Sequence, residues 1–260
     1  MKQLLTDDGV RIAWTEAGDP ARPAVLLSNS LGTNWGMWDD NLPDMTARFY
    51  VIRYDTRGHG RSQAPTGDYD MARLGADALS VMDAAGVPRA HVVGVSMGGM
   101  TGQWLGVHAS HRVDRLVLAN TAAVMGPSSA WQARMATVRN FGMAVIVDAV
   151  LERWFTSDFR ADHPDAVAKV RDMLLATSPH GYAGCCAAIR DMDQRGDIGA
   201  VVAPTLVIGG RLDPATPPET AGELARLIPG ARLEMLAAAH LSNIEQREAF
   251  GRLLVGFLEE

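Results

Sequence analysis

The residues most able to do chemistry are Gly94-Val95-Ser96-Met97-Gly98, a G-x-S-x-G sequence that directly follows the apolar run 90–93. An apolar run of this length predicts a short buried strand, and residues 100–107 behind the motif resemble a helix. A tight turn from strand to helix leaves no space for side chains beside the serine, which explains the two glycines. Ser96 would then stand above the sheet as a nucleophile. Free N–H groups at the start of the helix would favour a negative charge beside it.

A serine hydroxyl is a weak nucleophile, so it needs a base and a third group that orients the base. This strand–turn–helix motif is typical of the nucleophile elbow of α/β-hydrolases, where the chain order is serine, acid, histidine. Of seven histidines, that order selects His240, which lies between the last predicted strand and the last helix. Asp213 is the predicted acid because it follows the apolar run 205–209. Asn120, at the end of the preceding strand, cannot carry the required negative charge.

Acyl transfer also requires N–H donors directed at the oxyanion. The N–H of Met97, directly after the nucleophile, is one predicted donor. The second is the N–H of Leu31, in the loop after the strand 25–28, where Asn-Ser stands in place of the His-Gly often found in this fold. The loop 55–62 contains His59, which precedes Ser96 in the chain. We expect this loop to brace the site structurally.

Strand and helix patterns alternate along the chain, which predicts an α/β fold with a mostly parallel twisted sheet flanked by helices. The expected strands are 2–7 and 10–17 (a hairpin), 25–28, 50–54, 90–93, 115–119, 205–209 and 231–236; the expected core helices are 71–85, 100–107, 218–228 and 245–258. Residues 122–196 show helical periodicity without a strand, with expected helices at 131–152 and 164–176. We therefore expect an α/β-hydrolase core of residues 1–121 and 197–260. The segment 122–196 would be an all-helical cap inserted over the carboxyl ends of the strands, where ligands bind.

The composition is that of an ordinary globular protein, with 260 residues, 47% hydrophobic and 21% charged. A net charge of −6 argues against nucleic acid or an anionic membrane as partner. Acidic Asp7 and Asp8 interrupt the N-terminus before a signal peptide could form. The adjacent Cys185 and Cys186 lack metal-site spacing and fit a reducing compartment, so we expect a cytoplasmic protein. A homo-oligomer remains open.

Several segments resemble the 3-oxoadipate enol-lactonases (β-ketoadipate enol-lactone hydrolases), and the resemblance covers essentially the whole chain. They are residues 28–33 with 37–39, 94–99 with 102–105, and 239–246; the more specific matches, 152–155 and 181–192, lie in the expected cap. The resemblance implies opening of a small anionic enol-lactone that carries an acetate arm, through an acyl-enzyme on Ser96. It also implies that no metal and no organic cofactor is needed. The reaction would be a late step in bacterial breakdown of aromatic compounds.

The acetate arm of such a substrate requires a cation. The cap offers four arginines: Arg134, Arg139, Arg153 and Arg190. Arg134 is favoured because it lies one helical turn from Trp131, which would form an aromatic wall beside it. Two alternatives use the same triad, a broad carboxylesterase and a C–C bond hydrolase of ring-cleavage products. A receptor-like protein with slow turnover and a perhydrolase side activity also remain open.

Overall fold

The computed structural model describes residues 1–260 and confirms the α/β class. Eight strands form one sheet in the order β1-β2-β4-β3-β5-β6-β7-β8. They are β1 (Lys2–Leu5), β2 (Arg11–Ala17), β3 (Ala24–Ser28), β4 (Tyr50–Tyr54), β5 (Ala90–Val95), β6 (Val113–Ala119), β7 (Thr205–Gly210) and β8 (Arg232–Leu236). The hairpin β1–β2 is antiparallel, as predicted, and β2 is antiparallel to β4; the six strands from β4 to β8 in the sheet order are parallel.

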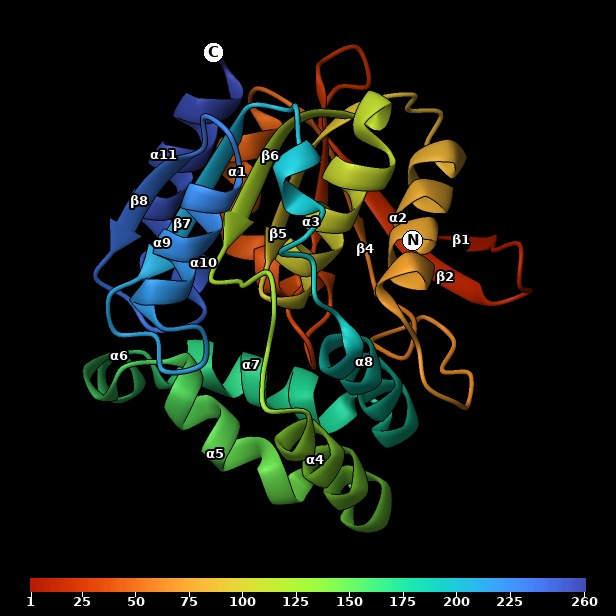
Figure 1. The fold of residues 1–260 in the computed structure, drawn as a ribbon, viewed down its shortest axis with the longest axis vertical. Helices are drawn as coiled ribbons and strands as arrows, with labels where there is room; N and C mark the ends of the chain where they lie inside the picture. The colour runs from red at the N-terminus through yellow and green to blue at the C-terminus, as the bar shows by residue number, and fades with distance from the viewer.

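Helices cover both faces of the sheet (Figure 1). The core helices are α1 (Leu42–Thr46), α2 (Met71–Ala84), α3 (Met97–His108), α9 (Pro218–Leu227), α10 (Ser242–Glu245) and α11 (Arg247–Leu258). Alternate side chains of a strand point to opposite faces. On β3, Val25 and Leu27 therefore join one buried cluster with α1 and α11, whereas Leu26 joins a second with α2, α3 and α9. The buried faces fix the register of the strands that carry the site.

Five further helices follow β6 and precede β7, and we call them the cap. They are α4 (Ser128–Phe141), α5 (Ala144–Trp154), α6 (Ser157–Asp162), α7 (Pro164–Ala176) and α8 (Pro179–Asp191). In Figure 1 they form a layer coloured green to teal below the ends of the strand arrows. Val124 and Asp193, on the two linkers, pair in an isolated β-bridge, so the chain enters and leaves this layer at one place. The limits 122–196 stay a prediction.

Two predicted helices are wrong in detail. The expected helix 131–152 is two helices, because Gly142 has φ 78° and ends α4. A positive φ is favourable for glycine and typical of a helix end. The expected helix 245–258 begins later, at Arg247, because Gln246 has non-helical backbone angles and separates α10 from α11. Helix α7 begins at Pro164 and ends at Ala176, as predicted.

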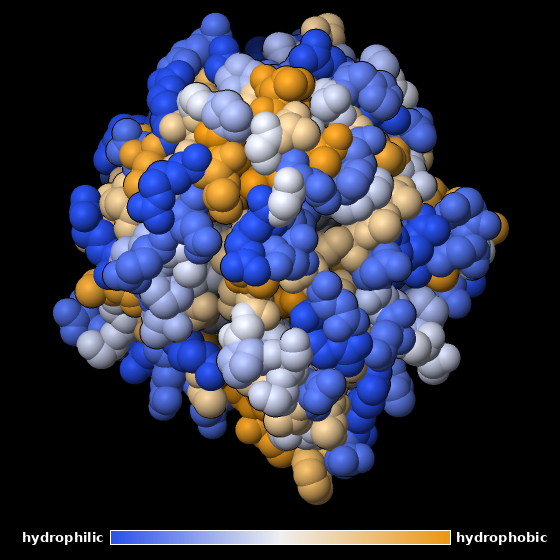
Figure 2. Space-filling view, viewed as in Figure 1, coloured by the Kyte–Doolittle hydropathy of each residue, from blue (hydrophilic) through white to orange (hydrophobic).

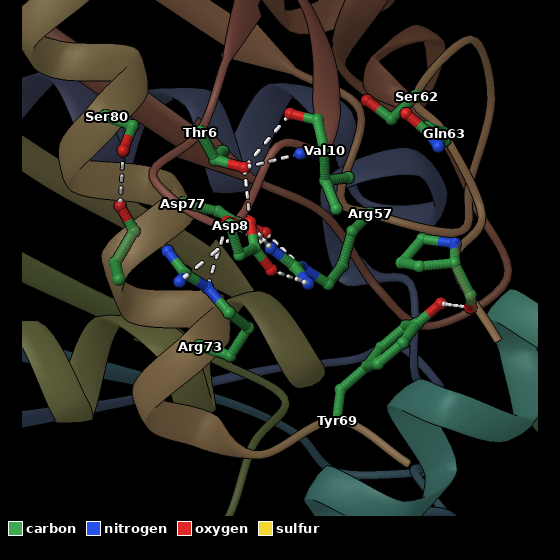
Figure 3. Close-up of polar contacts among 12 residues, drawn as sticks. Thr6, Asp8, Val10, Arg57, Ser62, Gln63, Tyr69, Arg73, Asp77 and Ser80 are labelled. Carbon is green, nitrogen blue, oxygen red and sulfur yellow. Dashed lines mark hydrogen bonds and ion pairs between the residues drawn. The ribbon is translucent and has the colours of Figure 1, made fainter. Parts of the chain in front are cut away.

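A buried ion pair anchors the loop after β4 (Figure 3). The Arg57 guanidinium lies between the carboxylates of Asp77 and Asp8, with Nε donating to Asp77 Oδ2 at 2.5 Å and Nη1 to Asp8 Oδ2 at 3.0 Å. Arg57 and Asp77 are 3% and 1% exposed. Hydrogen bonding from Arg57 lowers the pKa of Asp8 to about 2. The loop 55–62 is thus fixed to α2 and to the β1–β2 turn.

The face shown in Figure 2 is covered mainly by hydrophilic side chains, and its apolar side chains lie in small separate groups. Scattered apolar side chains of this kind are normal on a protein surface. None of the helices combines the length and the apolar character needed to cross a membrane.

Candidate active site

Ser96 lies at the sharp turn between β5 and α3, with φ 57° and ψ −118°. Its N–H donates to the carbonyl of Ala119 at 2.9 Å, and its carbonyl accepts from Thr121 Oγ1 at 2.8 Å. These bonds hold a backbone conformation that a side chain disfavours. A Cβ on Gly94 would lie 2.1 Å from the carbonyl oxygen of Gly98, so only glycine fits there. The predicted elbow geometry is therefore present.

Asp213 and His240 lie together although 27 residues separate them: His240 Nδ1 is 2.8 Å from Asp213 Oδ2. The carboxylate also accepts hydrogen bonds from the N–H groups of Ala215 and Thr216 and from Thr216 Oγ1. Burial by itself raises the pKa of Asp213, but the neighbouring His240 charge and these hydrogen bonds outweigh it and lower the pKa to about 2. Asp213 is therefore ionised at neutral pH and can orient an imidazole and stabilise its protonated form.

Asn120 lies beside the acid rather than in its place. Its Nδ2 donates to Asp213 Oδ2 at 3.0 Å and to the carbonyl of Ala239 at 3.1 Å, while its Oδ1 accepts from Ser242 Oγ. With φ 46°, it is one of two non-glycine residues at positive φ, the other being Ser96. Asn120 thus connects the acid loop to both sides of His240.

Ser96 and His240 line the same cavity of ≈ 210 Å³. The Ser96 hydroxyl forms no hydrogen bond to the imidazole in this structure. Such contacts often become short only in the complex with substrate. The complete lining is Leu31, Ser96, Met100, Met125, Trp131, Arg134, Arg153, Trp154, Tyr182, Ile189, Pro214, Ala215, Thr216 and His240. A reacting carbonyl group in this cavity would therefore be beside both the candidate nucleophile and the candidate base.

The two predicted oxyanion donors belong to the residue that follows Ser96 and to a residue that lines the cavity with it. Met97 is the first residue of α3, so its N–H has no partner within the helix. The N–H of Leu31 forms no hydrogen bond to the protein, and Leu31 lines the cavity. The next N–H, that of Gly32, donates to His59 Nε2 at 2.8 Å, and His59 Nδ1 lies 3.1 Å from the carbonyl of Arg57. The loop 55–62 thus contacts the loop that carries Leu31, as expected of a brace.

His59 must be neutral to accept this hydrogen bond at Nε2 while Nδ1–H donates to Arg57. The residue is 1% exposed. Burial lowers the pKa of His59 to about 4, while the hydrogen bond to the Arg57 carbonyl acts in the opposite direction. The neutral form, and with it this hydrogen bond, is therefore present throughout the physiological pH range.

Cationic and aromatic groups meet in the cavity. The Arg134 guanidinium lies 5.1 Å from the centre of the Trp131 ring, so the predicted pair shares one wall. Arg153 lines the same cavity, and neither arginine forms an ion pair. Burial, and then the charge of Arg134, lower the pKa of Arg153. The hydroxyl of Tyr182 is buried without a hydrogen-bond partner. No Asp or Glu lines the cavity, so its charged groups are suited to an anion.

The other two arginine candidates lie elsewhere. Arg139 and Arg190 both pair with Asp68, at 2.8 and 3.3 Å, and neither lines the cavity. Sequence reasoning includes Arg153 among the candidates without favouring it and does not identify Tyr182. The sequence does contain a clue to both residues: Arg153 lies in segment 152–155 and Tyr182 in segment 181–192, the two cap segments that carry the specific resemblance. No group of three His, Cys, Asp or Glu side chains is arranged to hold a metal ion.

Comparison with known proteins places this geometry among hydrolases. A family model described as the alpha/beta hydrolase fold matches residues 23–246. The chain is 41% identical to 3-oxoadipate enol-lactonase 2 of Acinetobacter baylyi over 249 residues, 96% of this chain and 93% of that protein. It is 36% identical to 3-oxoadipate enol-lactonase 1 of the same organism, over 93% of this chain and 91% of that one. The solved enol-lactonase from Burkholderia xenovorans LB400 has a TM-score of 0.97 and 40% identity, with 100% of both chains covered.

Proposed function

Because the chain belongs to the α/β-hydrolases and, within them, to the 3-oxoadipate enol-lactonases, we propose that it hydrolyses 3-oxoadipate enol-lactone to 3-oxoadipate. The substrate is a small ring ester with an acetate arm, and the product is an intermediate of bacterial aromatic breakdown. The family makes the protein a hydrolase of ester bonds. The choice of this lactone as substrate depends on the groups that line the cavity.

One observation carries the substrate proposal. Two unpaired guanidiniums, Arg134 and Arg153, and the unpartnered hydroxyl of Tyr182 line the cavity that also contains Ser96 and His240. A carboxylate is the natural counterion, because arginine and a buried hydroxyl both donate hydrogen bonds to it. A cavity of ≈ 210 Å³ suits a single small ring. A broad carboxylesterase for neutral esters has no use for two partly buried cations without an acidic partner.

In the acylation step, Ser96 Oγ attacks the lactone carbonyl while His240 takes the hydroxyl proton. Asp213 holds the imidazole through Nδ1 and stabilises the imidazolium. The N–H groups of Leu31 and Met97 donate to the oxyanion of the tetrahedral intermediate. When this intermediate collapses, the C–O bond of the ring breaks and the departing oxygen receives the proton from His240. An enol leaves more readily than an alcohol does, and it becomes a ketone by tautomerisation.

In the deacylation step, water attacks the acyl-enzyme. His240 takes a proton from this water and returns one to Ser96 Oγ, so the site is restored. Because the substrate is a ring, the former leaving group stays attached to the acyl chain. Hydrolysis must therefore outpace ring closure. Holding the acetate arm at Arg134 and Arg153 would keep the ketone end away from the acyl carbon.

The test is the loss of ultraviolet absorbance of enol-lactone generated in situ, compared for the wild type and Ser96→Ala. We expect fast turnover by the wild type and a loss of several orders of magnitude in the variant. Hydrolysis of p-nitrophenyl acetate is measured in parallel. Wild-type turnover of the aryl ester without turnover of the lactone would overturn the lactonase assignment and favour the carboxylesterase. The C–C bond hydrolase is tested with a ring-cleavage product as substrate.

A further inference from the structure

The two residues that flank His240 in the chain are each held by a hydrogen bond to another segment. The N–H of Leu241 donates to the carbonyl of Trp154, in the cap, at 3.1 Å. The N–H of Ala239 donates to the carboxylate of Glu245 at 2.9 Å. These two contacts fix the backbone from which the imidazole projects, and Asp213 then holds the ring itself through Nδ1.

Glu245 is also bound to the cap. Its second carboxylate oxygen accepts hydrogen bonds from Thr156 Oγ1 and from Thr156 N–H, the latter at 3.3 Å. Thr156 caps α6, with its side chain accepting from the N–H of Phe159. One carboxylate on α10 therefore joins the loop of the candidate base to the junction between α5 and α6.

The cap residue next to this junction also faces the imidazole. The rings of Trp154 and His240 lie 6.0 Å apart at an interplanar angle of 31°, and both residues line the cavity. Trp154 is two residues from Thr156, so the segment 154–156 contacts the His240 loop through a ring, a backbone carbonyl and a hydroxyl. A shift of this segment would move the cavity wall and the candidate base together.

We infer that Glu245 is a positioning residue that sets the orientation of His240 and couples it to the cap. It touches no reacting atom and acts through Ala239 on one side and Thr156 on the other. The carboxylate form is required because three donors converge on its two oxygens, whereas a glutamine would present an N–H₂ group to one set of them. The inference rests on the proposed function only in using His240 as the base for Ser96.

The experiment measures the reactivity of Ser96 without the lactone. The second-order rate of labelling by a fluorophosphonate and the kcat and KM for p-nitrophenyl acetate are measured from pH 5 to 9, a range of about two units on either side of neutrality. The variants are Glu245→Ala, Glu245→Gln, Thr156→Val and the double variant Glu245→Ala/Thr156→Val. Glu248→Ala is the matched control, because this exposed glutamate pairs only with Arg252 at 3.8 Å. Thermal unfolding followed by circular dichroism identifies the variants that are folded at the assay temperature.

We expect Glu245→Ala to lower the labelling rate and kcat by about 10- to 100-fold, with little change in KM, because a misplaced base slows proton transfer without weakening binding. The labelling rate and kcat of Glu245→Gln should lie between those of Glu245→Ala and those of the wild type. Thr156→Val should lower kcat several-fold, and its effect should be smaller in the Glu245→Ala background because both changes break one connection. The pH profile should shift in the Glu245 variants and not in Glu248→Ala.

A wild-type labelling rate in folded Glu245→Ala would overturn the inference. So would wild-type kinetics of Thr156→Val beside a slow Glu245→Ala, since the connection to the cap would then be irrelevant. Failure of the proposed function gives a different result: the enol-lactone is not opened, yet labelling by the fluorophosphonate still depends on Glu245 and Thr156.

Discussion

The imidazole of His59 accepts a hydrogen bond from the N–H of Gly32 at 2.8 Å, across 27 residues of sequence. Gly32 directly follows Leu31, whose N–H is a proposed oxyanion donor. On its other side His59 contacts the carbonyl of Arg57, and Arg57 is fixed by Asp77. A buried ion pair, a neutral histidine and the oxyanion loop thus form one connected series. Through these contacts the loop 55–62, although it precedes Ser96 in the chain, supports the site.

The first prediction concerns the pH dependence of stability. The pKa of His59 is about 4 in the folded protein and 6.5 for an unperturbed histidine. Between these pH values, His59 is therefore protonated in the unfolded chain but not in the folded protein. Above pH 6.5 the titration of His59 does not change the free energy of unfolding. Below pH 6.5 protonation of the unfolded chain lowers the free energy of unfolding. Between pH 7 and pH 4 the free energy of unfolding of the wild type should fall by about 3 kcal/mol more than that of His59→Gln.

Urea unfolding at pH 7, 5.5 and 4 measures this difference. Glutamine retains an acceptor and a donor but does not titrate in this range. His163→Gln, at an exposed position, is the matched control and should keep the wild-type slope. Parallel curves for the wild type and His59→Gln would show that His59 is not a buried neutral histidine.

The second prediction separates binding of the carboxylate from the chemistry. Arg134→Gln and Arg153→Gln should each raise KM for the enol-lactone by about 10- to 100-fold, the range expected when a charged hydrogen bond to a carboxylate is lost. Hydrolysis of p-nitrophenyl acetate, which has no carboxylate, should change little. Arg139→Gln is the control from the same helix as Arg134, α4, because Arg139 pairs with Asp68 outside the cavity. Equal losses on both substrates would argue for a structural role of the two arginines.

The third prediction concerns the ion pair in Figure 3. Asp77→Ala removes the buried partner of Arg57, which is 3% exposed and then keeps only its pair with the more exposed Asp8. A buried charge left wholly unpaired costs about 3–5 kcal/mol; because Asp8 still pairs with Arg57 in this variant, we expect a loss of about 2–4 kcal/mol. Asp148→Ala, which breaks an exposed pair with Arg171, should cost less than about 1 kcal/mol. Urea denaturation at pH 7 measures both, and similar midpoints for the two variants would contradict the assigned difference.

The fourth prediction tests the elbow with two glycines of one helix. A Cβ on Gly98 would lie 2.2 Å from the carbonyl oxygen of Ser28, so Gly98→Ala must displace the chain that leads to Leu31. We expect a loss of about 1–3 kcal/mol in stability and about 100-fold in kcat. Gly102→Ala meets only side-chain atoms at 3.2 Å or more and should be nearly neutral. Comparable kcat values for the two variants would contradict this account.

Local patterns are sufficient for the class of fold and for most of its elements. Apolar runs predict the parallel strands and Pro164 predicts the start of α7, because burial and proline act over a few residues. The interpretation of 131–152 as one helix is wrong because its apolar periodicity continues past Gly142, where the chain turns. The break at Gln246 has no glycine or proline to mark it.

The sequence alone determined the motif around Ser96, the order in which an acid and His240 follow it, and the pairing of Trp131 with Arg134 on one helix face. Each of these depends on spacing along the chain, which local geometry translates directly into position. Tertiary structure decided which distant groups meet: Asn120 with Asp213, Arg153 and Tyr182 with Arg134, and Glu245 with Ala239 and Thr156. These contacts depend on how the loops after the strands meet one another and, for Arg134, Arg153, Tyr182 and Thr156, on how the cap packs over the strand ends. That packing is the sum of many weak interactions between segments far apart in the chain, so no short pattern encodes it.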